Sequence, residues 1–384
     1  MAHPKVMIIG SDNASDLYGS KLADNLKLLR PDISLFGIGG PKMRDAGIRL
    51  LYNIFDLDNL GVVESIKGAH LMKRLVQRLN ESMDRLQPDL VIQIGLPVSN
   101  FRLIELAHSK GIPVLYYYTP LSMNFADLKL SRLQSVVDKV LAVTRYEERI
   151  CKEAQIDVEF VGHPLLDLVS PSQSVAESKA QWSLSDALPI VSVLPGQREV
   201  EVKAVLPTLL RGLKRVQDKG QNVQVIVSHM SVLSEERMNT MIKNSGLDDV
   251  RVISNIYDVL NVADLALVTC GCTSLEAALM GKPSLAVHKV AATSYLLDKM
   301  LTHKSYFSMV NFLLEKLAMP ELVQSNLTES KVAKEIIRLL ADTDLKATMV
   351  TEFKRLPDVL GSFGAIERAT QAVLVMLDQD TEDN

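Results

Sequence analysis

The amino-acid sequence predicts an α/β protein with two tandem Rossmann-like parallel-sheet domains facing a central cleft, followed by a helical C-terminal tail. Its 384 residues are too many for one core and suit two domains. Continuous apolar runs of strand length alternate with stretches of helical period, which indicates a parallel sheet covered by helices on both faces. The same alternation starts again in the second half. Open parallel sheets bind ligands at the carboxyl ends of their strands, so a ligand site is expected at the strand ends of these domains.

The first domain is expected to span residues 1–170. Its predicted strands are short apolar runs, which lie at 6–9, 33–38, 90–94, 114–118, 140–143 and 158–161. Amphipathic stretches between these runs have the 3.6-residue period of helices, at 20–29, 71–86 and 103–109. This order of strands and helices is typical of a sheet wound in one direction.

A polar connector rich in Ser and Ala, residues 171–188, is expected to join the two domains, and it carries the only tryptophan. The second domain, residues 189–325, has predicted strands at 190–194, 223–227, 250–253, 265–269 and 284–287. Predicted helices lie at 207–217, 234–244 and 273–280. The remaining segment, residues 326–384, is predicted to hold three helices, broken near 342–344 and 361–364.

The composition excludes several classes of function. A net charge of -4 and a pI near 6.0 are unlike those of a nucleic-acid-binding protein. The three cysteines, Cys151, Cys270 and Cys272, lack zinc-site spacing, so small buried side chains are favoured over a redox or metal role. The chain starts with a short strand, and no stretch has the roughly 18 apolar residues of a membrane span. A cytoplasmic protein, at most attached to a membrane surface, is expected.

A turn after the strand at 190–194 is the first candidate for ligand binding. Gly196 allows a sharp turn and a close approach of the backbone to a ligand. Arg198, at the edge of this turn, has the planar guanidinium that pairs bidentately with phosphate. The alternative is an ordinary strand-to-helix turn with a solvated arginine.

A second candidate follows the strand at 265–269. Gly271 is predicted to turn the chain, and Thr273 to start a helix whose first N–H groups suit an anion such as a diphosphate. Glu276 has two interpretations: it closes a capping box with Thr273, or it accepts hydrogen bonds from ribose hydroxyls beside the phosphate. Together with the Gly196–Arg198 turn, the second interpretation is favoured.

Six stretches in a fixed order resemble the lipid-A-disaccharide synthase family. They are FGIGGPKM at 36–43 with Gly47, LGVVES at 60–65, FVGHPLLD at 160–167, LPGQR at 194–198, the block at 271–276, and Asn311 with PELVQ at 320–324. Each stretch alone is weak, whereas six in order are specific. The resemblance covers essentially the whole chain.

This resemblance implies a GT-B glycosyltransferase that joins UDP-2,3-diacylglucosamine to lipid X, releases UDP and forms the lipid A disaccharide. No metal is expected, and no cofactor besides the UDP-sugar donor. The first domain would take the acyl chains, and a homodimer through the helical tail and a peripheral position at the inner face of the inner membrane are expected. The donor site is expected to contain Gly196, Arg198, Gly271, Thr273, Glu276, Asn311 and Gln324.

The acceptor half departs from the family pattern. After the strand at 90–94 the family carries two aspartates, and the second is taken as the general base. Counting back from Gly111 places Gly95 and Val98 at these two positions. Aligning on Phe101 places Pro97 and Asn100 there instead. A positioned base contributes roughly 10²–10⁴-fold to a rate. The carboxylates kept after the first strand, Asp12 and Asp16, are therefore the candidate catalytic residues.

Two alternatives stay open from the sequence. One is a catalytically weak or inactive homologue that binds nucleotide-sugar or lipid, which the missing aspartate favours. The other is a sugar-nucleotide epimerase of the same architecture, for which His163 is the candidate residue. A further hypothesis concerns residues 62–72, which would form an apolar lip that contacts anionic lipid and is flanked by basic side chains. Its apolar residues are Val62, Val63, Ile66, Leu71 and Met72.

Overall fold

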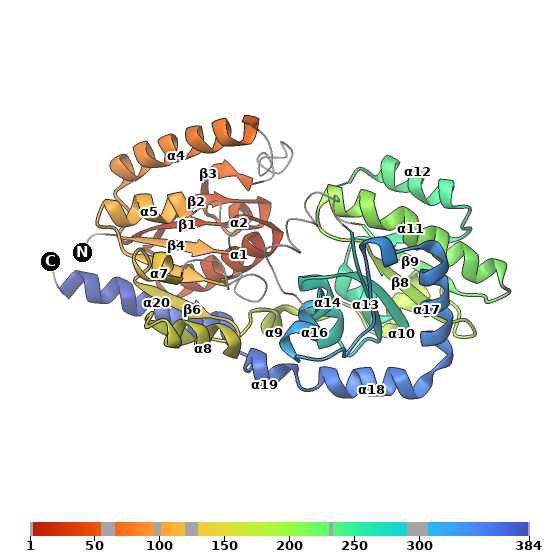
Figure 1. The fold of residues 1–384 in the computed structure, drawn as a ribbon. Helices are drawn as coiled ribbons and strands as arrows, with labels where there is room; N and C mark the ends of the chain where they lie inside the picture. Colours follow the sequence, from red (N-terminus) through yellow and green to blue (C-terminus); the bar gives the residue numbers. More distant parts are fainter. Residues whose placement is uncertain are drawn as a thin grey trace. The chain divides into compact units, whose positions relative to one another are not determined.

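Two parallel sheets, each wound with helices, make up the computed structural model of the chain (Figure 1). The structure describes residues 3–54, 66–95, 101–119, 130–229, 233–289 and 306–382, without the side chains of 66–72 and 379–382. The chain divides into two compact units. The first combines Met1–Asp167 with Leu360–Asn384, and the second is Leu168–Val359.

The sheet of the first unit has seven parallel strands in the order β3-β2-β1-β4-β5-β6-β7. Strands β1 and β4 lie at its centre and are apolar and buried, as expected for strands covered on both faces. The strands are β1 (Lys5–Ile9), β2 (Ser34–Gly39), β3 (Arg49–Asn53), β4 (Leu90–Ile94), β5 (Val114–Tyr117), β6 (Lys139–Ala142) and β7 (Val158–Phe160).

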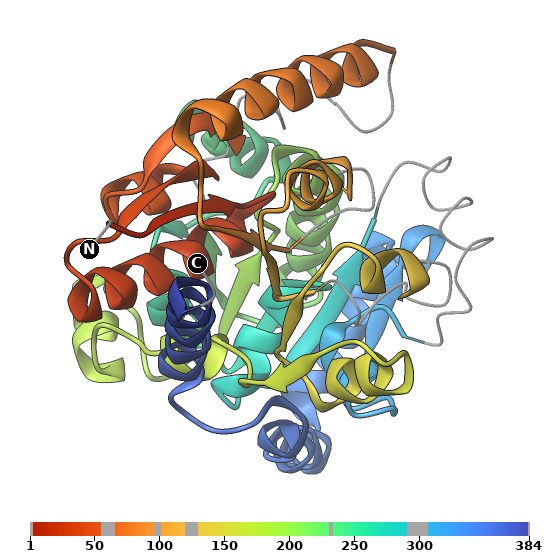
Figure 2. The ribbon, with the colours of Figure 1, turned by 90° about the vertical axis from the view of Figure 1, so that its left-hand side faces the viewer.

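Helices cover both faces of this sheet. Helices α4 (Ile66–Leu86) and α5 (Phe101–Ser109) pack on the face that carries Met7 and Ile9, where Leu75 and Leu79 of α4 are buried. Helix α20 (Ala365–Glu382) packs beside α1 (Asn13–Leu29) (Figure 2). The remaining helices are α2 (Pro41–Asp45), α7 (Leu130–Gln134), α8 (Arg145–Glu153) and α9 (Leu165–Leu168).

The sheet of the second unit has six parallel strands in the order β10-β9-β8-β11-β12-β13. Its central strands β8 and β11 are fully buried. The strands are β8 (Ile190–Leu194), β9 (Gln224–Ser228), β10 (Val250–Ile253), β11 (Leu265–Thr269), β12 (Ser284–His288) and β13 (Glu321–Val323).

Two helix layers cover the second sheet. Helix α11 (Glu199–Asp218) packs against α12 (Glu235–Ser245) and, more closely, against α17 (Glu329–Ala341). A β carbon at Gly212 of α11 would lie 2.5 Å from Val332 Cγ1 of α17, so glycine is what permits this contact. Side chains of α13 and α14 pack into a core with β8, β9 and β11. The other helices are α10 (Val175–Gln181), α13 (Ile256–Asn261), α14 (Cys272–Leu279), α16 (Met309–Leu313), α18 (Thr343–Phe353) and α19 (Leu356–Leu360).

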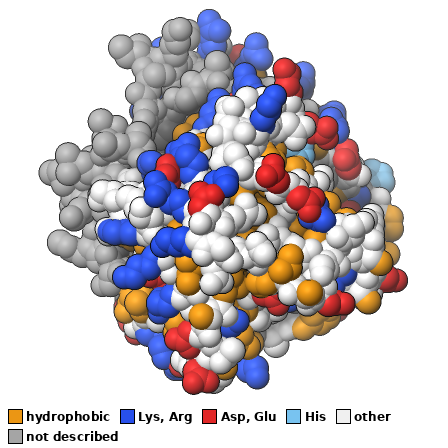
Figure 3. Space-filling model, turned by 90° about the vertical axis from the view of Figure 1, so that its right-hand side faces the viewer, with side chains coloured by type: hydrophobic (Ala, Val, Ile, Leu, Met, Phe, Trp, Pro, Cys, Tyr) orange, Lys and Arg blue, Asp and Glu red, His pale blue; other side chains and the backbone are white. Residues whose placement is uncertain are grey.

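The outer face of the second unit, over α11, α12 and α17, mixes acidic and basic side chains (Figure 3). Glu329 pairs with both Arg211 and Arg215, and Glu199 pairs with both Lys203 and Arg237. These four cations are paired within the protein, so their charge is offset by neighbouring carboxylates.

The last helix returns to the first unit, and the loop that brings it there is tied to the segment after β7. The carboxylate of Asp167 accepts hydrogen bonds from Gly364 N (2.7 Å) and Ile366 N (2.8 Å) at the start of α20. The Arg368 guanidinium donates to the carbonyls of Val161, Phe363 and Ser362. These bonds satisfy backbone groups that a helix start and an irregular loop leave unpaired.

The predicted strands agree with the observed ones to within one or two residues at each end, but β3 and β13 were not expected. Both are edge strands of their sheets and are only partly buried. The predicted helical tail contains four helices instead of three, and α20 belongs to the first unit. The predicted connector packs within the second unit, where Asp258 accepts hydrogen bonds from the Ser172 and Gln173 amides.

The hypothesis of an apolar lip at 62–72 concerns side chains outside the described ones. Within the described part of α4, Lys73, Arg74 and Arg78 are exposed, as expected for its basic face. Among the helices that the structure describes, none has the length and apolar character needed to cross a bilayer.

Replacing Asp167 with Ala is expected to destabilise the first unit. The change removes two hydrogen bonds at the start of α20, and loss of such a cap costs about 1–2 kcal/mol. Thermal unfolding should therefore begin at a lower temperature. Asp378→Ala is the control, because Asp378 is exposed and its pair with Arg30 lies at the surface, where such pairs contribute about 0–1 kcal/mol. Equal midpoints for the two variants would show that Asp167 does not anchor α20.

Candidate functional site

Each sheet has one point where the chain reverses the direction in which it adds strands. In the first sheet this point lies between β1 and β4, and in the second it lies between β8 and β11. The helices that follow two such strands leave on opposite faces of the sheet, so a crevice opens beyond the strand ends. Asp12 and Asp16 follow β1, whereas Gly196 and Arg198 follow β8 and Gly271, Thr273 and Glu276 follow β11.

The turn after β8 carries a glycine that no other residue could replace without strain. Gly196 has φ 117°, and a β carbon there would lie 2.8 Å from Glu201 Oε2. Arg198 is the N-cap residue of α11, and its Nη2 donates to Glu201 Oε1 at 2.6 Å. The Arg198 side chain is 58% exposed, so it can reach a ligand above the turn.

The turn after β11 is open, unlike the turn after β8. Gly271 is the N-cap residue of α14 with φ 104°, and among the described residues no heavy atom lies within 4 Å of where its β carbon would be. Within the same part of the chain, no side chain caps this helix and its first turn has no acidic residue. The N–H groups and positive dipole end of α14 can therefore receive an anion. Thr273 lies in this first turn and is buried.

Glu276 does not close a capping box, because the cap is Gly271 and Thr273 is the second residue of the helix. Instead, Glu276 Oε1 accepts a hydrogen bond from the Tyr257 hydroxyl at 3.1 Å. Tyr257 lies in α13, which follows β10 at the same edge of the sheet. Sequence reasoning missed Tyr257, because it lies 19 residues from Glu276 and only the fold brings the two together.

Asn311 is fully buried, and its amide is used within the protein. Its Nδ2 donates to Met319 O and to Glu321 Oε1, and its Oδ1 accepts from Met319 N. Asn311 therefore holds the segment that leads into β13, rather than presenting its amide to a ligand. Gln324 directly follows β13, so it lies at the same carboxyl edge of the sheet as Gly271. Its backbone has φ 51°.

In the first unit, Asp16, one of the two predicted catalytic residues, is used within the protein. Its carboxylate is buried and accepts hydrogen bonds from Gly40 N (2.7 Å), Met43 N (3.0 Å) and Lys42 N (3.1 Å). It thus caps the start of α2. The Asp16 side chain is therefore engaged by backbone donors and is enclosed.

Asp12 is exposed at the end of β1. It is the N-cap residue of α1, and its Oδ1 accepts from Ser15 N at 2.8 Å. Because a carboxylate can accept several hydrogen bonds, this cap leaves capacity for a further partner. Of the two predicted catalytic residues, Asp12 is the exposed one and Asp16 is buried. The alternative positions for the family's base, Pro97, Val98 and Asn100, lie outside the described residues.

Two other titratable groups near this edge are enclosed. Burial raises the pKa of Glu147 to about 8, although hydrogen bonds such as that from Val143 N oppose the shift. Burial lowers the pKa of His163 to about 3, and its Nδ1 accepts from Leu165 N. The neutral His163 ring packs edge-on against Tyr18 and Tyr118, so it is poorly placed for the acid–base chemistry of an epimerase.

The Cys270 thiol at the turn after β11 is not activated. Burial raises the pKa of Cys270, and the carboxylates of Glu321 and Glu201 add to this effect, so its thiol stays protonated. Within the described ranges, no group of three His, Cys, Asp or Glu side chains is arranged to hold a metal ion.

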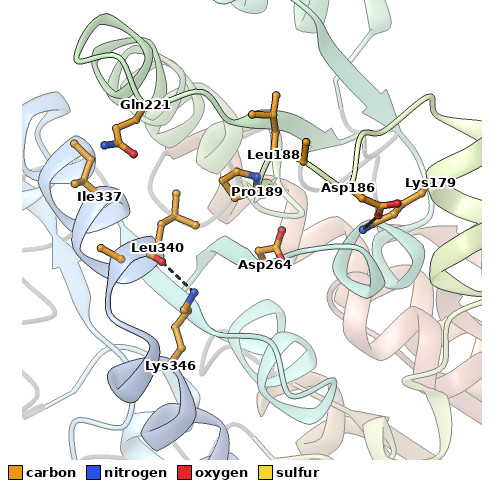
Figure 4. A pocket seen from close by; sticks show the side chains of 11 residues that line it. Lys179, Asp186, Leu188, Pro189, Gln221, Asp264, Ile337, Leu340 and Lys346 are labelled. Atoms are coloured by element: carbon orange, nitrogen blue, oxygen red, sulfur yellow. Dashed lines mark hydrogen bonds and ion pairs between the residues drawn. The ribbon is translucent and has the colours of Figure 1, made fainter.

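A pocket of about 440 Å³ lies at the opposite edge of the second sheet (Figure 4). Pro189 and Asp264, which line it, directly precede β8 and β11. Its lysines are engaged within the protein, since Lys179 pairs with Asp186 and Lys346 donates to Leu340 O. None of the predicted site residues lines this pocket, so the candidate site is the open carboxyl edge.

Comparison with known proteins decides the family. The chain matches the family model for lipid-A-disaccharide synthetase over residues 6–375. The chain belongs to the lipid-A-disaccharide synthase family. The lipid-A-disaccharide synthase of Syntrophus aciditrophicus is 33% identical over 373 residues, which are 97% of both chains. That of Myxococcus xanthus is 26% identical over 374 residues, which are 97% of this chain and 98% of the relative.

Solved structures confirm the predicted GT-B fold of this lipid-A-disaccharide synthase family member. MnaA of S. aureus, in a co-structure with UDP, has a TM-score of 0.68 at 13% identity over 98% of this chain and 97% of that one. The calicheamicin glycosyltransferase CalG4 has a TM-score of 0.57 at 15% identity, and the match covers 98% of this chain and 99% of that one. UDP-GlcNAc 2-epimerase from Neisseria meningitidis, bound to UDP-GlcNAc, has a TM-score of 0.63 and 11% sequence identity. The match covers 97% of this chain and 99% of that one. Epimerases and glycosyltransferases thus share this fold, which by itself does not separate them.

Replacing Asp16 with Asn is expected to lower stability, and Asp12→Asn is the matched control. The amide nitrogen of the introduced side chain could not accept a backbone N–H, and an unsatisfied buried group costs about 1–3 kcal/mol. An asparagine in place of Asp12 remains a good N-cap, so little change is expected there. Chemical denaturation of both variants measures the difference. Unchanged stability of Asp16→Asn would contradict the structural role.

Proposed function

We propose that this chain is a lipid-A-disaccharide synthase, which transfers 2,3-diacylglucosamine from UDP to lipid X and releases UDP. The observation that carries the proposal is the family match over residues 6–375, which extends across both units. The geometry at the β8 and β11 ends supports it, because a cation and an open helix N-terminus occur together there. The substrates are those that the family resemblance implies.

The donor site would use these groups as follows. The N–H groups at the start of α14 and the Arg198 guanidinium would bind the diphosphate, and Glu276, oriented by Tyr257, would accept hydrogen bonds from the ribose hydroxyls. Gly196 and Gly271 would let the backbone approach the ligand. As the sugar–phosphate bond breaks, negative charge grows on UDP, and the same cation and dipole stabilise it. Asn311 would support this site, and Gln324 would border it.

The acceptor hydroxyl must lose a proton as its oxygen bonds to the anomeric carbon. We assign this proton to the carboxylate of Asp12, since Asp16 and Glu147 are enclosed. The acyl chains are assigned to the first unit, and no metal or further cofactor is required. Contact with an anionic membrane surface, cytoplasmic location at the inner membrane and a homodimer remain parts of the proposal.

Two alternatives separate by their products. An epimerase would convert a UDP-sugar without an acceptor, and the neutral, enclosed His163 disfavours it. A homologue without turnover would bind UDP but form no disaccharide. Purified protein should be incubated with UDP-2,3-diacylglucosamine, with and without lipid X. We expect UDP and disaccharide only when both are present. Epimerised donor, or UDP binding without disaccharide, would contradict the proposal.

Replacing Arg198 with Ala is expected to weaken UDP binding by more than about tenfold, which is about 1.4 kcal/mol. The substitution removes the cation beside the diphosphate and leaves the Glu201 carboxylate there without that cation. Isothermal titration with UDP measures the change. Arg211→Ala is the control, since Arg211 lies on the same helix but pairs with Glu329 on the outer face. Unchanged UDP affinity in Arg198→Ala would remove the nucleotide site from this turn.

Replacing Asp12 with Asn is expected to reduce turnover by roughly 10²-fold or more while UDP affinity stays the same. An amide keeps the helix cap but cannot take up the proton. Steady-state rates with both substrates, together with UDP titration, give the two quantities. Wild-type turnover in this variant would exclude Asp12 as the base.

A further inference from the structure

A carboxylate occupies the turn after β8, in the place where an anionic ligand would be held. Glu201 is the third residue of α11, and its side chain folds back toward the start of the helix. Its Oε1 accepts from Arg198 Nη2 at 2.6 Å, and its Oε2 accepts from Gln197 N at 3.3 Å. One cation and one backbone N–H of the turn are thus already bonded to a negative group.

The turn is shaped around this carboxylate. A β carbon at Gly196 would lie 2.8 Å from Glu201 Oε2 and 2.9 Å from Glu201 Cβ, so the missing side chain leaves room for it. Glu201 is 21% exposed, whereas Arg198 is 58% exposed. The carboxylate therefore lies deeper in the turn than the guanidinium that it holds.

The turn that holds Glu201 neighbours the turn at the start of α14. Strands β8 and β11 are paired in parallel, so both turns follow adjacent strand ends at the same edge of the sheet. The Glu201 carboxylate also contributes to the raised pKa of the Cys270 thiol, after burial and Glu321. A diphosphate bound at α14 would carry its negative charge into the same region.

We propose that Glu201 is an internal stand-in for the donor's diphosphate, which holds Arg198 before the nucleotide binds and is displaced from it when the nucleotide arrives. This inference rests on the proposed nucleotide site. A diphosphate on the same guanidinium would be repelled by the Glu201 carboxylate, so we expect the nucleotide to displace Glu201 from Arg198. Breaking the Arg198–Glu201 pair offsets part of the attraction between Arg198 and UDP, so the product UDP dissociates more readily.

The competing explanation is that Glu201 only shapes the turn and positions Arg198 for the ligand. The two explanations predict opposite signs. If Glu201 competes with the nucleotide, removing its charge strengthens UDP binding. If it positions Arg198, removing its charge weakens UDP binding, as Arg198→Ala does.

The test compares Glu201→Gln and Glu201→Ala with Glu199→Gln by titration with UDP at low ionic strength. Glu199 lies in the same turn of α11 but pairs with Lys203 and Arg237, so its variant controls for the loss of one charge. We expect both Glu201 variants to lower the Kd for UDP about fivefold or more, and to slow UDP dissociation in stopped-flow displacement. Glu199→Gln should change the Kd less than about twofold.

A double variant, together with Arg198→Ala, distinguishes failure of the Glu201 proposal from failure of the proposed nucleotide site. In an Arg198→Ala background, Glu201→Gln should lose most of its effect on the Kd, because the contested guanidinium is gone. Unchanged or weaker UDP binding in folded Glu201→Gln and Glu201→Ala, while Arg198→Ala still weakens it, overturns the role of Glu201 alone. Unchanged UDP affinity in Arg198→Ala overturns the nucleotide site itself.

Discussion

The common direction of the strands is the constraint on which both candidate sites depend. The strand pairs of both sheets are parallel, so all carboxyl ends of a sheet lie at one edge. Parallel strands need a crossover helix, and the first turn of each such helix then lies at this edge as well. Asp12 after β1, Arg198 after β8 and Gly271 after β11 are consequences of this arrangement. The pocket at the other edge, beside Pro189 and Asp264, has no comparable supply of helix N-termini among its described lining residues.

The two turns at the centre of the second sheet have different electrostatic roles. Helix α11 starts with Glu199 and Glu201, whose carboxylates already satisfy its positive end. Helix α14 starts with Gly271 and has no acidic residue in its first turn. An anion is therefore favoured at α14, while α11 contributes Arg198 from the adjacent strand end. Glu276, held by Tyr257, adds an acceptor for hydroxyl groups one turn further along α14.

Local patterns predicted most of the fold, and long-range contacts account for what they missed. The apolar runs that became β4, β8, β10 and β11 had the predicted bounds. The unexpected strands β3 and β13 are partly buried strands at the edges of their sheets. The return of α20 to the first unit depends on Asp167 and Arg368, whose hydrogen bonds join positions about 200 residues apart in the sequence. No periodicity carries that information.

The candidate site was proposed from local sequence. Glycines, an arginine and a predicted helix start pointed to the turns after β8 and β11. The hydrogen-bond partners of these polar side chains could not be predicted from the sequence. Asp16 accepts from the α2 amides, Glu276 accepts from Tyr257 and Asn311 donates to Glu321 only in the folded chain. Asp16 is an example, because its carboxylate accepts backbone N–H groups at the start of α2 that the sequence did not reveal.

The most direct test of the donor site is a crystal structure of the protein with UDP. We expect the diphosphate within hydrogen-bonding distance of the backbone N–H groups at the start of α14, with Arg198 turned from Glu201 toward a phosphate and the ribose hydroxyls on Glu276. UDP bound away from the α14 N-terminus, with the Arg198–Glu201 pair intact, would contradict this account of the site.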